Sequence, residues 1–274
     1  MALQHKKRTI ILGAVAAVIV ALIIAAAVYL NTYYPAGQAA KESLQSDAVV
    51  SVRTCDDGDI VFEPADHQSA NGAGLVFYPG AKVEYAAYAP LMHALSERGF
   101  TCVLVKMPFN MAFFDIDAAN AARGSAPDVT RWYVGGHSLG GAMAAKYLAG
   151  HADEYAGLLL CASYATEDLS ADDLAVLSAY GTQDGVLNCD SYQSNWKNLP
   201  PNAQELVIDG GNHAQFGDYG AQDGDGEASI APAEQVSETA DAFAQLDGHV
   251  SQPLIEFRSA TPVAFTCAAL LLIV

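Results

Sequence analysis

The segment from residue 131 to residue 150 contains a motif that demands a sharp turn of the chain. It reads RWYVGG, then His137 and Ser138, then LGGAMAAKYLAG, so a strand pattern passes directly into a helix of small residues. Glycine stands two positions before and two positions after the serine, at Gly136 and Gly140. A serine at the tip of a strand-to-helix turn has a strained backbone, and side chains at these two positions would collide. The sequence therefore predicts a tight turn with Ser138 at its tip.

The helix that begins at Leu139 would direct its N-terminus at the Ser138 hydroxyl. Free N–H groups and the helix dipole favour negative charge at such a place. The N–H of Leu139 is therefore a candidate donor to an oxyanion formed at the serine. In the alternative interpretation, Ser138 only caps a glycine-rich turn. The strand before it, the helix after it and the doubled glycines favour a nucleophile.

The rest of the chain alternates between strand and helix patterns. Strands are expected as a hairpin at 51–54 and 60–64, and then at 75–80, 101–107, 131–136, 157–163, 175–181 and 205–209. Helices are expected at 87–99, 115–124, 139–150 and 231–246. Strands that alternate with helices form a mostly parallel sheet covered on both faces. We therefore predict the α/β class, with one domain over residues 48–250.

The sequence Gly-His-Ser-Leu-Gly-Gly at 136–141 resembles the nucleophile elbow of esterases and lipases of the α/β-hydrolase fold. The resemblance covers about residues 48–246, through the order of strands and motifs. It implies a serine hydrolase whose nucleophile, acid and histidine follow one another in that order along the chain. Members of this family need no cofactor for this reaction, and none is expected here.

The resemblance assigns the acid and the base to two loops after later strands. Asp184 ends a Gly-x-x-Asp segment after the strand 175–181, where the family keeps its acid. His213 lies on a glycine-rich loop after the strand 205–209, where the family keeps its general base. Alternatively, Asp184 belongs to an ordinary Asp-Gly turn and His213 is an exposed loop residue. Asp190 is the second candidate for the acid.

A second oxyanion donor is expected on the loop after the strand 75–80. The family often begins this loop with His-Gly, whereas this chain has Pro79-Gly80 followed by Ala81. The N–H of Ala81 is the candidate donor. The form YPGAKVEY, together with NHAQFGDYG after the last strand, resembles a less studied branch of the fold, so substrates of well-known lipases do not transfer to it.

Residues 10–30 form an uninterrupted apolar run without charge. At 1.5 Å per residue a helix of this length spans about 30 Å, which is enough to cross a bilayer core. The basic residues just before it should stay in the cytoplasm, which places the hydrolase domain outside the cell membrane. We expect a basic stub at 1–9, a single transmembrane helix at 10–30 and a polar tether at 31–47. A cleaved signal peptide, cut at the small residues near 36–40, is the alternative.

Charge and motifs exclude several other functions. The formal net charge is −18. Three of the basic residues precede the apolar run, so the domain itself is even more acidic and should repel nucleic acid. The sequence has neither a P-loop nor a Gly-x-Gly-x-x-Gly motif that opens a helix after a strand. Asp223, Asp225 and Glu227 hint at calcium, but their spacing suits an acidic turn better, and no metal is expected. A Cys55–Cys189 disulfide has no support from the pattern, whereas buried thiols are expected at Cys102 and Cys161.

The expected function is hydrolysis of an ester or related acyl bond in a small molecule, through an acyl-enzyme on Ser138. A peptidase or a thioesterase would use the same residues, and a catalytically silent domain that binds ligands at the cell surface is a further alternative. Two short segments, 108–114 and 164–173, are the candidate lid, and they suggest modest substrates instead of large lipid aggregates. The apolar tail at 251–274 has no assigned role.

Overall fold

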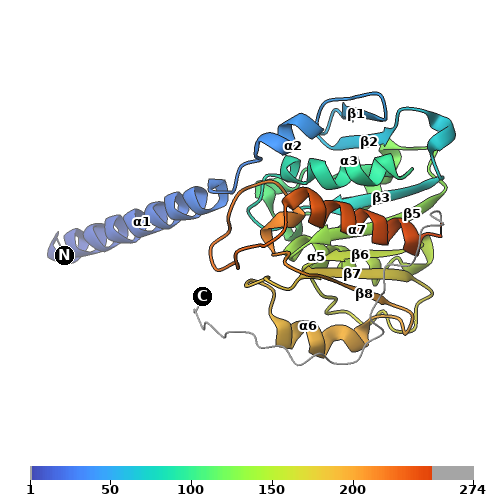
Figure 1. The fold of residues 1–274 in the computed structure, drawn as a ribbon. Coiled ribbons are helices and arrows are strands. Elements are labelled where there is room, and N and C mark those ends of the chain that lie inside the picture. Colours follow the sequence, from blue (N-terminus) through green and yellow to red (C-terminus); the bar gives the residue numbers. More distant parts are fainter. Residues whose placement is uncertain (1, 249–274) are drawn as a thin grey trace. The chain divides into compact units, whose positions relative to one another are not determined.

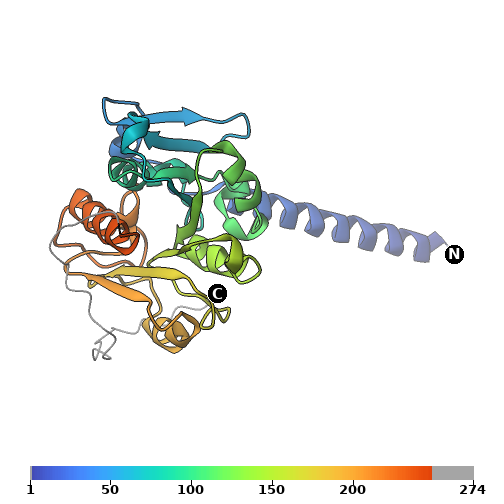
Figure 2. The ribbon, with the colours of Figure 1, turned by 90° about the vertical axis from the view of Figure 1, so that its right-hand side faces the viewer.

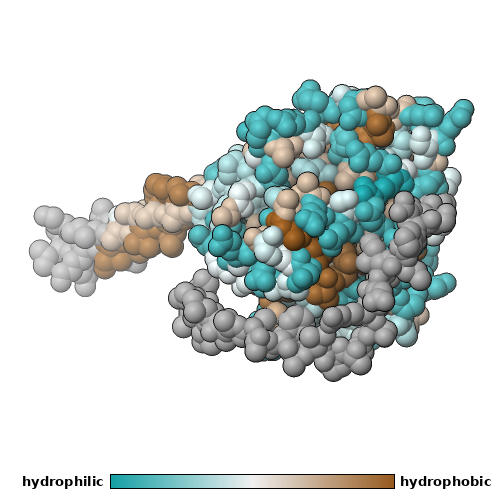
Figure 3. Space-filling model, in the orientation of Figure 1, coloured by the Kyte–Doolittle hydropathy of each residue, from teal (hydrophilic) through white to brown (hydrophobic). Residues whose placement is uncertain are grey.

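The computed structural model describes residues 2–248, and these divide into two compact units between Tyr33 and Tyr34. The first unit is the helix α1 (Ala2–Asn31). Its segment Ile11–Asn31 is long and apolar enough to cross a membrane, and none of that segment is buried. A signal sequence would have the same properties. Figure 3 shows hydrophobic residues along the coloured part of α1, in contrast to a largely hydrophilic surface on the second unit.

The second unit is built on one sheet, which confirms the predicted α/β class. Within residues 34–248, eight strands are ordered β1-β2-β4-β3-β5-β6-β7-β8. Strand β2 runs antiparallel to β1 and to β4, and the other neighbours are parallel. The strands are β1 (Val50–Thr54), β2 (Ile60–Pro64), β3 (Ala73–Tyr78), β4 (Thr101–Leu104), β5 (Arg131–His137), β6 (Gly157–Cys161), β7 (Ala175–Gly181) and β8 (Gln204–Ile208).

Helices cover both faces of the sheet (Figures 1 and 2). On one face, Leu75 and Phe77 of β3 belong to a core with α2 (Gln38–Ser43), α3 (Ala89–Glu97) and α7 (Pro232–Leu246). On the other face, Val76 and Tyr78 of the same strand share a core with α4 (Ala119–Ala122) and α5 (Leu139–Leu148). Successive residues of β3 thus alternate between two apolar layers, as expected for a strand buried on both faces.

The expected polar tether at 31–47 is wrong for most of its length, because the folded unit begins at Tyr34. Tyr34 donates its N–H to the Lys82 carbonyl at 2.7 Å, and its own carbonyl accepts from Glu84 N at 2.9 Å. Ala40 in α2 is fully buried, and its N–H donates to Asp218 Oδ2 at 2.8 Å. The small residues of this segment let its backbone pack closely against the domain, so the linker after α1 is much shorter than expected.

The expected helix at 115–124 is shorter than the sequence indicated, because α4 has only one turn. The hydroxyl of Tyr78 accepts from Ala119 N at 2.9 Å and donates to the Ile116 carbonyl at 2.7 Å. This side chain from β3 therefore holds the backbone at the start of α4. Two helices were not expected from the sequence, α2 and α6 (Cys189–Asn195), and α6 packs Tyr192 against Tyr180 of β7.

The four described cysteines carry thiols. Cys102 and Cys161 are fully buried, which confirms the expectation for both. Burial raises the pKa of the Cys102 thiol to about 12, so it stays protonated. Cys55 and Cys189 are not joined by a disulfide.

We predict that Tyr78→Phe destabilises the folded unit. The change leaves the Ala119 N–H and the Ile116 carbonyl without their buried partner, which costs about 1–3 kcal/mol. Urea unfolding of the full chain in detergent, followed by circular dichroism, measures the effect. Tyr164→Phe, a change of the same kind at a half-buried tyrosine, should stay within about 0.5 kcal/mol of the native chain. Equal unfolding midpoints for the two variants would contradict the role of the Tyr78 hydroxyl.

Candidate active site

The turn between β5 and α5 has the strained geometry that the sequence predicted. Ser138 lies there with φ 52° and ψ −124°, a conformation that a non-glycine residue adopts only when its surroundings enforce it. Its N–H donates to the Cys161 carbonyl at 2.9 Å, and its carbonyl accepts from Ser163 Oγ at 2.7 Å. Both contacts come from β6 and the residues after it. Ser163 was not identified from the sequence, because no motif marks it.

Both flanking glycines are required by close backbone contacts. A Cβ atom on Gly136 would lie 2.6 Å from the Gly140 carbonyl carbon. A Cβ atom on Gly140 would lie 2.3 Å from the carbonyl oxygens of Tyr78 and Pro79. No side chain fits at such distances. The start of α5 is therefore pressed against the loop that follows β3.

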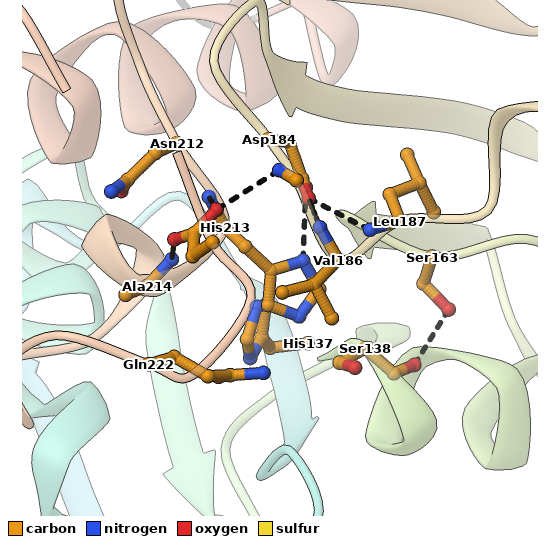
Figure 4. A network of polar contacts seen from close by, with 12 residues as sticks. His137, Ser138, Ser163, Asp184, Val186, Leu187, Asn212, His213, Ala214 and Gln222 are labelled. Carbon is orange, nitrogen blue, oxygen red and sulfur yellow. Dashed lines mark hydrogen bonds and ion pairs between the residues drawn. The ribbon is translucent and has the colours of Figure 1, made fainter. Parts of the chain in front are cut away.

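The predicted acid and base form a buried pair. His213 Nδ1 lies 2.9 Å from Asp184 Oδ2, and the two side chains are only 1% and 2% exposed. The other oxygen of Asp184 accepts from the N–H groups of Val186 at 2.9 Å and Leu187 at 2.8 Å (Figure 4). A carboxylate held in this way accepts a hydrogen bond from Nδ1–H and leaves Nε2 of the histidine free as a base.

Asp225 joins the loops that carry the acid and the base. Its Oδ1 accepts from Gly185 N at 3.1 Å and from His213 N at 3.2 Å, while Oδ2 accepts from Ala214 N at 2.8 Å. Sequence reasoning placed this residue in an acidic turn or a calcium site and missed its contact with the histidine loop. Among residues 2–248 no group of three His, Cys, Asp or Glu side chains could hold a metal ion.

Helix α7 fixes the same loop from the other side. The side-chain amide of Gln235 is fully buried, and it accepts from Asn212 N at 3.0 Å and donates to the Asn212 carbonyl at 2.8 Å. These two bonds satisfy both backbone groups of the residue before His213. The position of the histidine is thus set by the strand before it, by Asp225 and by α7.

Figure 4 shows Ser138 near the imidazole rings of His213 and His137. The Nε2 atom of His213 is buried and has no hydrogen-bond partner among the described residues. The Ser138 hydroxyl is not hydrogen bonded to it in this structure. Catalytic hydrogen bonds are often long without a bound substrate and tighten when it binds. The structure therefore brings the three predicted residues to one end of the sheet, with the free nitrogen of the histidine available.

Asp190, the second candidate for the acid, is exposed in the first turn of α6. The hydrogen bond of His213 goes to Asp184 instead.

His137 belongs to a buried chain of contacts that the sequence did not reveal. Gly80 N donates to the Tyr88 oxygen at 3.0 Å, and that hydroxyl lies 2.8 Å from His137 Nδ1. Because the tyrosine oxygen already accepts from Gly80, its own proton can go to Nδ1, which puts the imidazole proton on Nε2. Burial lowers the pKa of His137 well below its ordinary value, and nearby His213 lowers it further. His137 is therefore neutral.

The two expected oxyanion donors lie on segments that touch. Leu139 is the first residue of α5, where its N–H has no partner within the helix. Ala81 lies on the loop after β3, between Gly80, whose N–H bonds to Tyr88, and Lys82, whose N–H bonds to the Asn110 carbonyl at 2.8 Å. The peptide N–H of Ala81 makes no hydrogen bond to the described part of the chain. Contacts on both sides of Ala81 hold this loop in place.

Comparison with solved structures gives the same fold. A structure described as a "predicted CIB-like hydrolase" from Thermoplasma acidophilum has a TM-score of 0.52 and 15% identity, and the match covers 72% of this chain and 98% of the other. Est1E from Butyrivibrio proteoclasticus has a TM-score of 0.50 and 14% identity, with coverage of 73% and 99%. No curated protein matches the sequence. A model described as the alpha/beta hydrolase family matches residues 74–237, which is more than half of the chain, and the chain therefore belongs to the α/β hydrolase family.

Proposed function

We propose that the chain is a membrane-anchored serine hydrolase that cleaves a carboxylic ester of a small molecule. The observation that carries the proposal is the buried His213–Asp184 pair at the same end of the sheet as a serine in a strained turn. A salt bridge that serves only stability gains little from burial, because desolvation of the two groups offsets their attraction. A histidine with one nitrogen paired to a carboxylate and the other left free has the form of a general base.

In the first step, Nε2 of His213 takes the Ser138 proton while the serine oxygen attacks the ester carbonyl. The negatively charged oxygen of the tetrahedral intermediate accepts hydrogen bonds from the N–H groups of Ala81 and Leu139. Asp184 stabilises the imidazolium that forms. The His213 proton then passes to the alkoxide leaving group, which departs as an alcohol and leaves an acyl-serine.

In the second step, His213 takes a proton from water, and the hydroxide attacks the acyl-serine carbonyl. The same two N–H groups receive the negative charge. Ser138 leaves with the proton returned by His213, and the product is a carboxylic acid. Every proton is moved by one imidazole, so no metal or organic cofactor is part of the scheme.

The membrane anchor is the second part of the proposal. The helix α1 is apolar over Ile11–Asn31, and Lys6, Lys7 and Arg8 precede that segment, an order that orients the hydrolase domain away from the cytoplasm. Cleavage near residues 36–40 would remove Tyr34 and Ala36, which bind to and pack within the folded domain. This packing favours an anchor that stays attached.

The oxyanion donors depend on the buried chain Gly80–Tyr88–His137. The Tyr88 hydroxyl fixes the Gly80 peptide, the residue next to Ala81 in the loop. A donor stabilises the transition state only if it is aimed at the developing charge before the reaction begins. We therefore assign Tyr88 as a positioning residue for the Ala81 N–H.

Ser138→Ala should abolish both ester hydrolysis and covalent labelling. The variant lacks the only oxygen that can form the acyl-enzyme in this scheme. Turnover of p-nitrophenyl acetate and reaction with a fluorophosphonate probe measure the two effects. Ser163→Ala, which changes a serine that contacts the same turn, should still be labelled. A native chain that the probe does not label would identify a silent binding domain, and unchanged turnover in Ser138→Ala would exclude this serine.

Asp184→Asn should lower kcat by about 10³- to 10⁴-fold, because an amide supports the wrong tautomer of the histidine. Asp190→Asn serves as the matched control and should leave kcat within about twofold. Steady-state kinetics on p-nitrophenyl acetate distinguish the two carboxylates. A large loss in Asp190→Asn, with little change in Asp184→Asn, would reverse the assignment of the acid.

Tyr88→Phe should lower kcat by about tenfold or more while KM changes little, because loss of a preorganised donor affects the transition state more than the bound ester. Tyr85→Phe removes a hydroxyl from the same turn that bonds the Gly58 carbonyl instead, and it should keep the native kcat. A rise in KM with unchanged kcat in Tyr88→Phe would indicate a role in substrate binding and contradict the positioning role.

A further inference from the structure

Three phenylalanines lie exposed on the segment that follows β4. Phe109 is 50% exposed, and Phe113 and Phe114 are each 46% exposed. Their rings form one cluster, with centroids 5.4 Å apart for Phe109 and Phe114 and 4.1 Å apart for Phe113 and Phe114. Within residues 34–248, the only other exposed large hydrophobic side chain is Val49. We call this cluster the Phe surface.

The backbone of this segment presents the Phe surface outward. Phe109 and Asn110 have φ values of 54° and 53°, in the left-handed region that is uncommon for a bulky residue. The Asn110 carbonyl accepts from Lys82 N at 2.8 Å, and Asn110 N donates to the Met107 carbonyl at 3.1 Å. Specific contacts thus maintain a strained conformation that leaves an aromatic side chain in solvent. Backbone strain of this kind is typical of segments that bind a ligand.

The Phe surface is close to the start of the folded unit. Tyr34 N bonds to the Lys82 carbonyl and Lys82 N bonds to the Asn110 carbonyl, so Tyr34, Lys82 and Asn110 form one row of hydrogen bonds. Only two residues separate Asn31, the last residue of α1, from Tyr34. Three extended Cα steps span about 10 Å. A membrane that holds α1 therefore lies within that distance of Tyr34, however the two units are oriented.

We infer that the Phe surface inserts into the interface of the membrane that holds α1, and that Ser138 acts on an ester that has partitioned into this membrane. The inference rests on the proposed anchor and the proposed esterase activity. Aromatic side chains favour the interfacial region of a bilayer. The Phe surface belongs to the uncharged run 107–114, and the net charge of −18 disfavours anionic lipid, so the lipid it contacts is zwitterionic.

The Phe surface also lies at the same end of the sheet as the candidate active site. It follows β4, whose parallel neighbour β3 leads into the loop of Ala81. The carboxyl ends of parallel strands meet at one edge of a sheet, which is the edge that carries Ser138. A lipid interface at the Phe surface therefore lies beside the edge that an ester must reach.

Fluorescence quenching tests the contact directly. The full chain with Phe113→Trp is reconstituted in vesicles of phosphatidylcholine with brominated acyl chains. Val49→Trp is the control. Val49 precedes β1, whose first residue Val50 pairs with Pro64, and this end of the sheet is opposite to the end that carries Ser138. The emission of Trp132 and Trp196 in the native chain is subtracted from that of each variant. The remaining emission of Phe113→Trp should be less than half as strong in brominated as in unbrominated vesicles, whereas that of Val49→Trp should not fall in this way. Equal quenching of the two would overturn the inference.

Kinetics separate a lipid contact from a wall of the substrate site. A chain with Phe109→Ser, Phe113→Ser and Phe114→Ser should hydrolyse soluble p-nitrophenyl acetate as fast as the native chain. Its turnover of a long-chain ester in phosphatidylcholine vesicles should fall at least tenfold. An equal loss on both substrates would make the Phe surface part of the substrate site and overturn the inference, as would no loss on either. If the native chain hydrolyses neither ester, the proposed function fails, while the quenching result still decides the membrane contact.

Discussion

The left-handed backbone at Ser138 is the constraint on which the rest of the site depends. A φ of 52° at a non-glycine residue is unfavourable by itself, so neighbouring segments must hold it in place. Ser163 and the Cys161 carbonyl hold the peptide groups of Ser138 from the side of β6. On the side of β3, the contact of Gly140 with the Pro79 carbonyl leaves no room for a side chain. The same close packing brings the Ala81 loop against the first turn of α5, so one turn positions both the serine and its two candidate oxyanion donors.

Hydrogen bonds from backbone N–H groups to side-chain oxygens hold the predicted acid and base in place. Asp184 accepts two N–H groups besides its bond to His213, and Asp225 accepts N–H groups from both loops. Gln235 reaches across from α7 to satisfy the backbone of Asn212. A carboxylate surrounded by N–H donors is stabilised as an anion without a cation nearby. This pattern lets a strongly acidic domain keep several carboxylates close to its site.

The sequence predicted what short-range patterns determine. The strand-to-helix turn, both flanking glycines and the parallel sheet follow from local sterics and periodicity, and the motif order identified Asp184 and His213 as a pair. Contacts between distant segments were not predictable. Ser163, Asp225 and Gln235 belong to no motif, and they act because the fold brings residues tens of positions apart together. The 31–47 segment was expected to be a tether because it is polar and short, whereas Ala40 is buried and its N–H bonds to Asp218, a residue distant in the sequence. The length of the 115–124 helix was overestimated, because the Tyr78 hydroxyl of β3 determines where the helix begins.

The neutrality of His137 has a consequence for the proposed reaction. Its ring centroid lies 4.5 Å from that of His213, which becomes a cation when it takes the serine proton. Two unit charges about 4 Å apart repel by about 4 kcal/mol at an effective dielectric constant of about 20, so a charged His137 would oppose that proton transfer. Burial lowers the pKa of His137 well below its ordinary value, so this imidazole stays uncharged as the pH falls below neutrality. Asp184, which lies 2.9 Å from His213 Nδ1, carries the negative charge that stabilises the imidazolium in the proposed reaction. In the proposed reaction the buried Tyr88–His137 contact therefore serves the base as well as the loop of Ala81, because it holds a neutral imidazole beside Ser138.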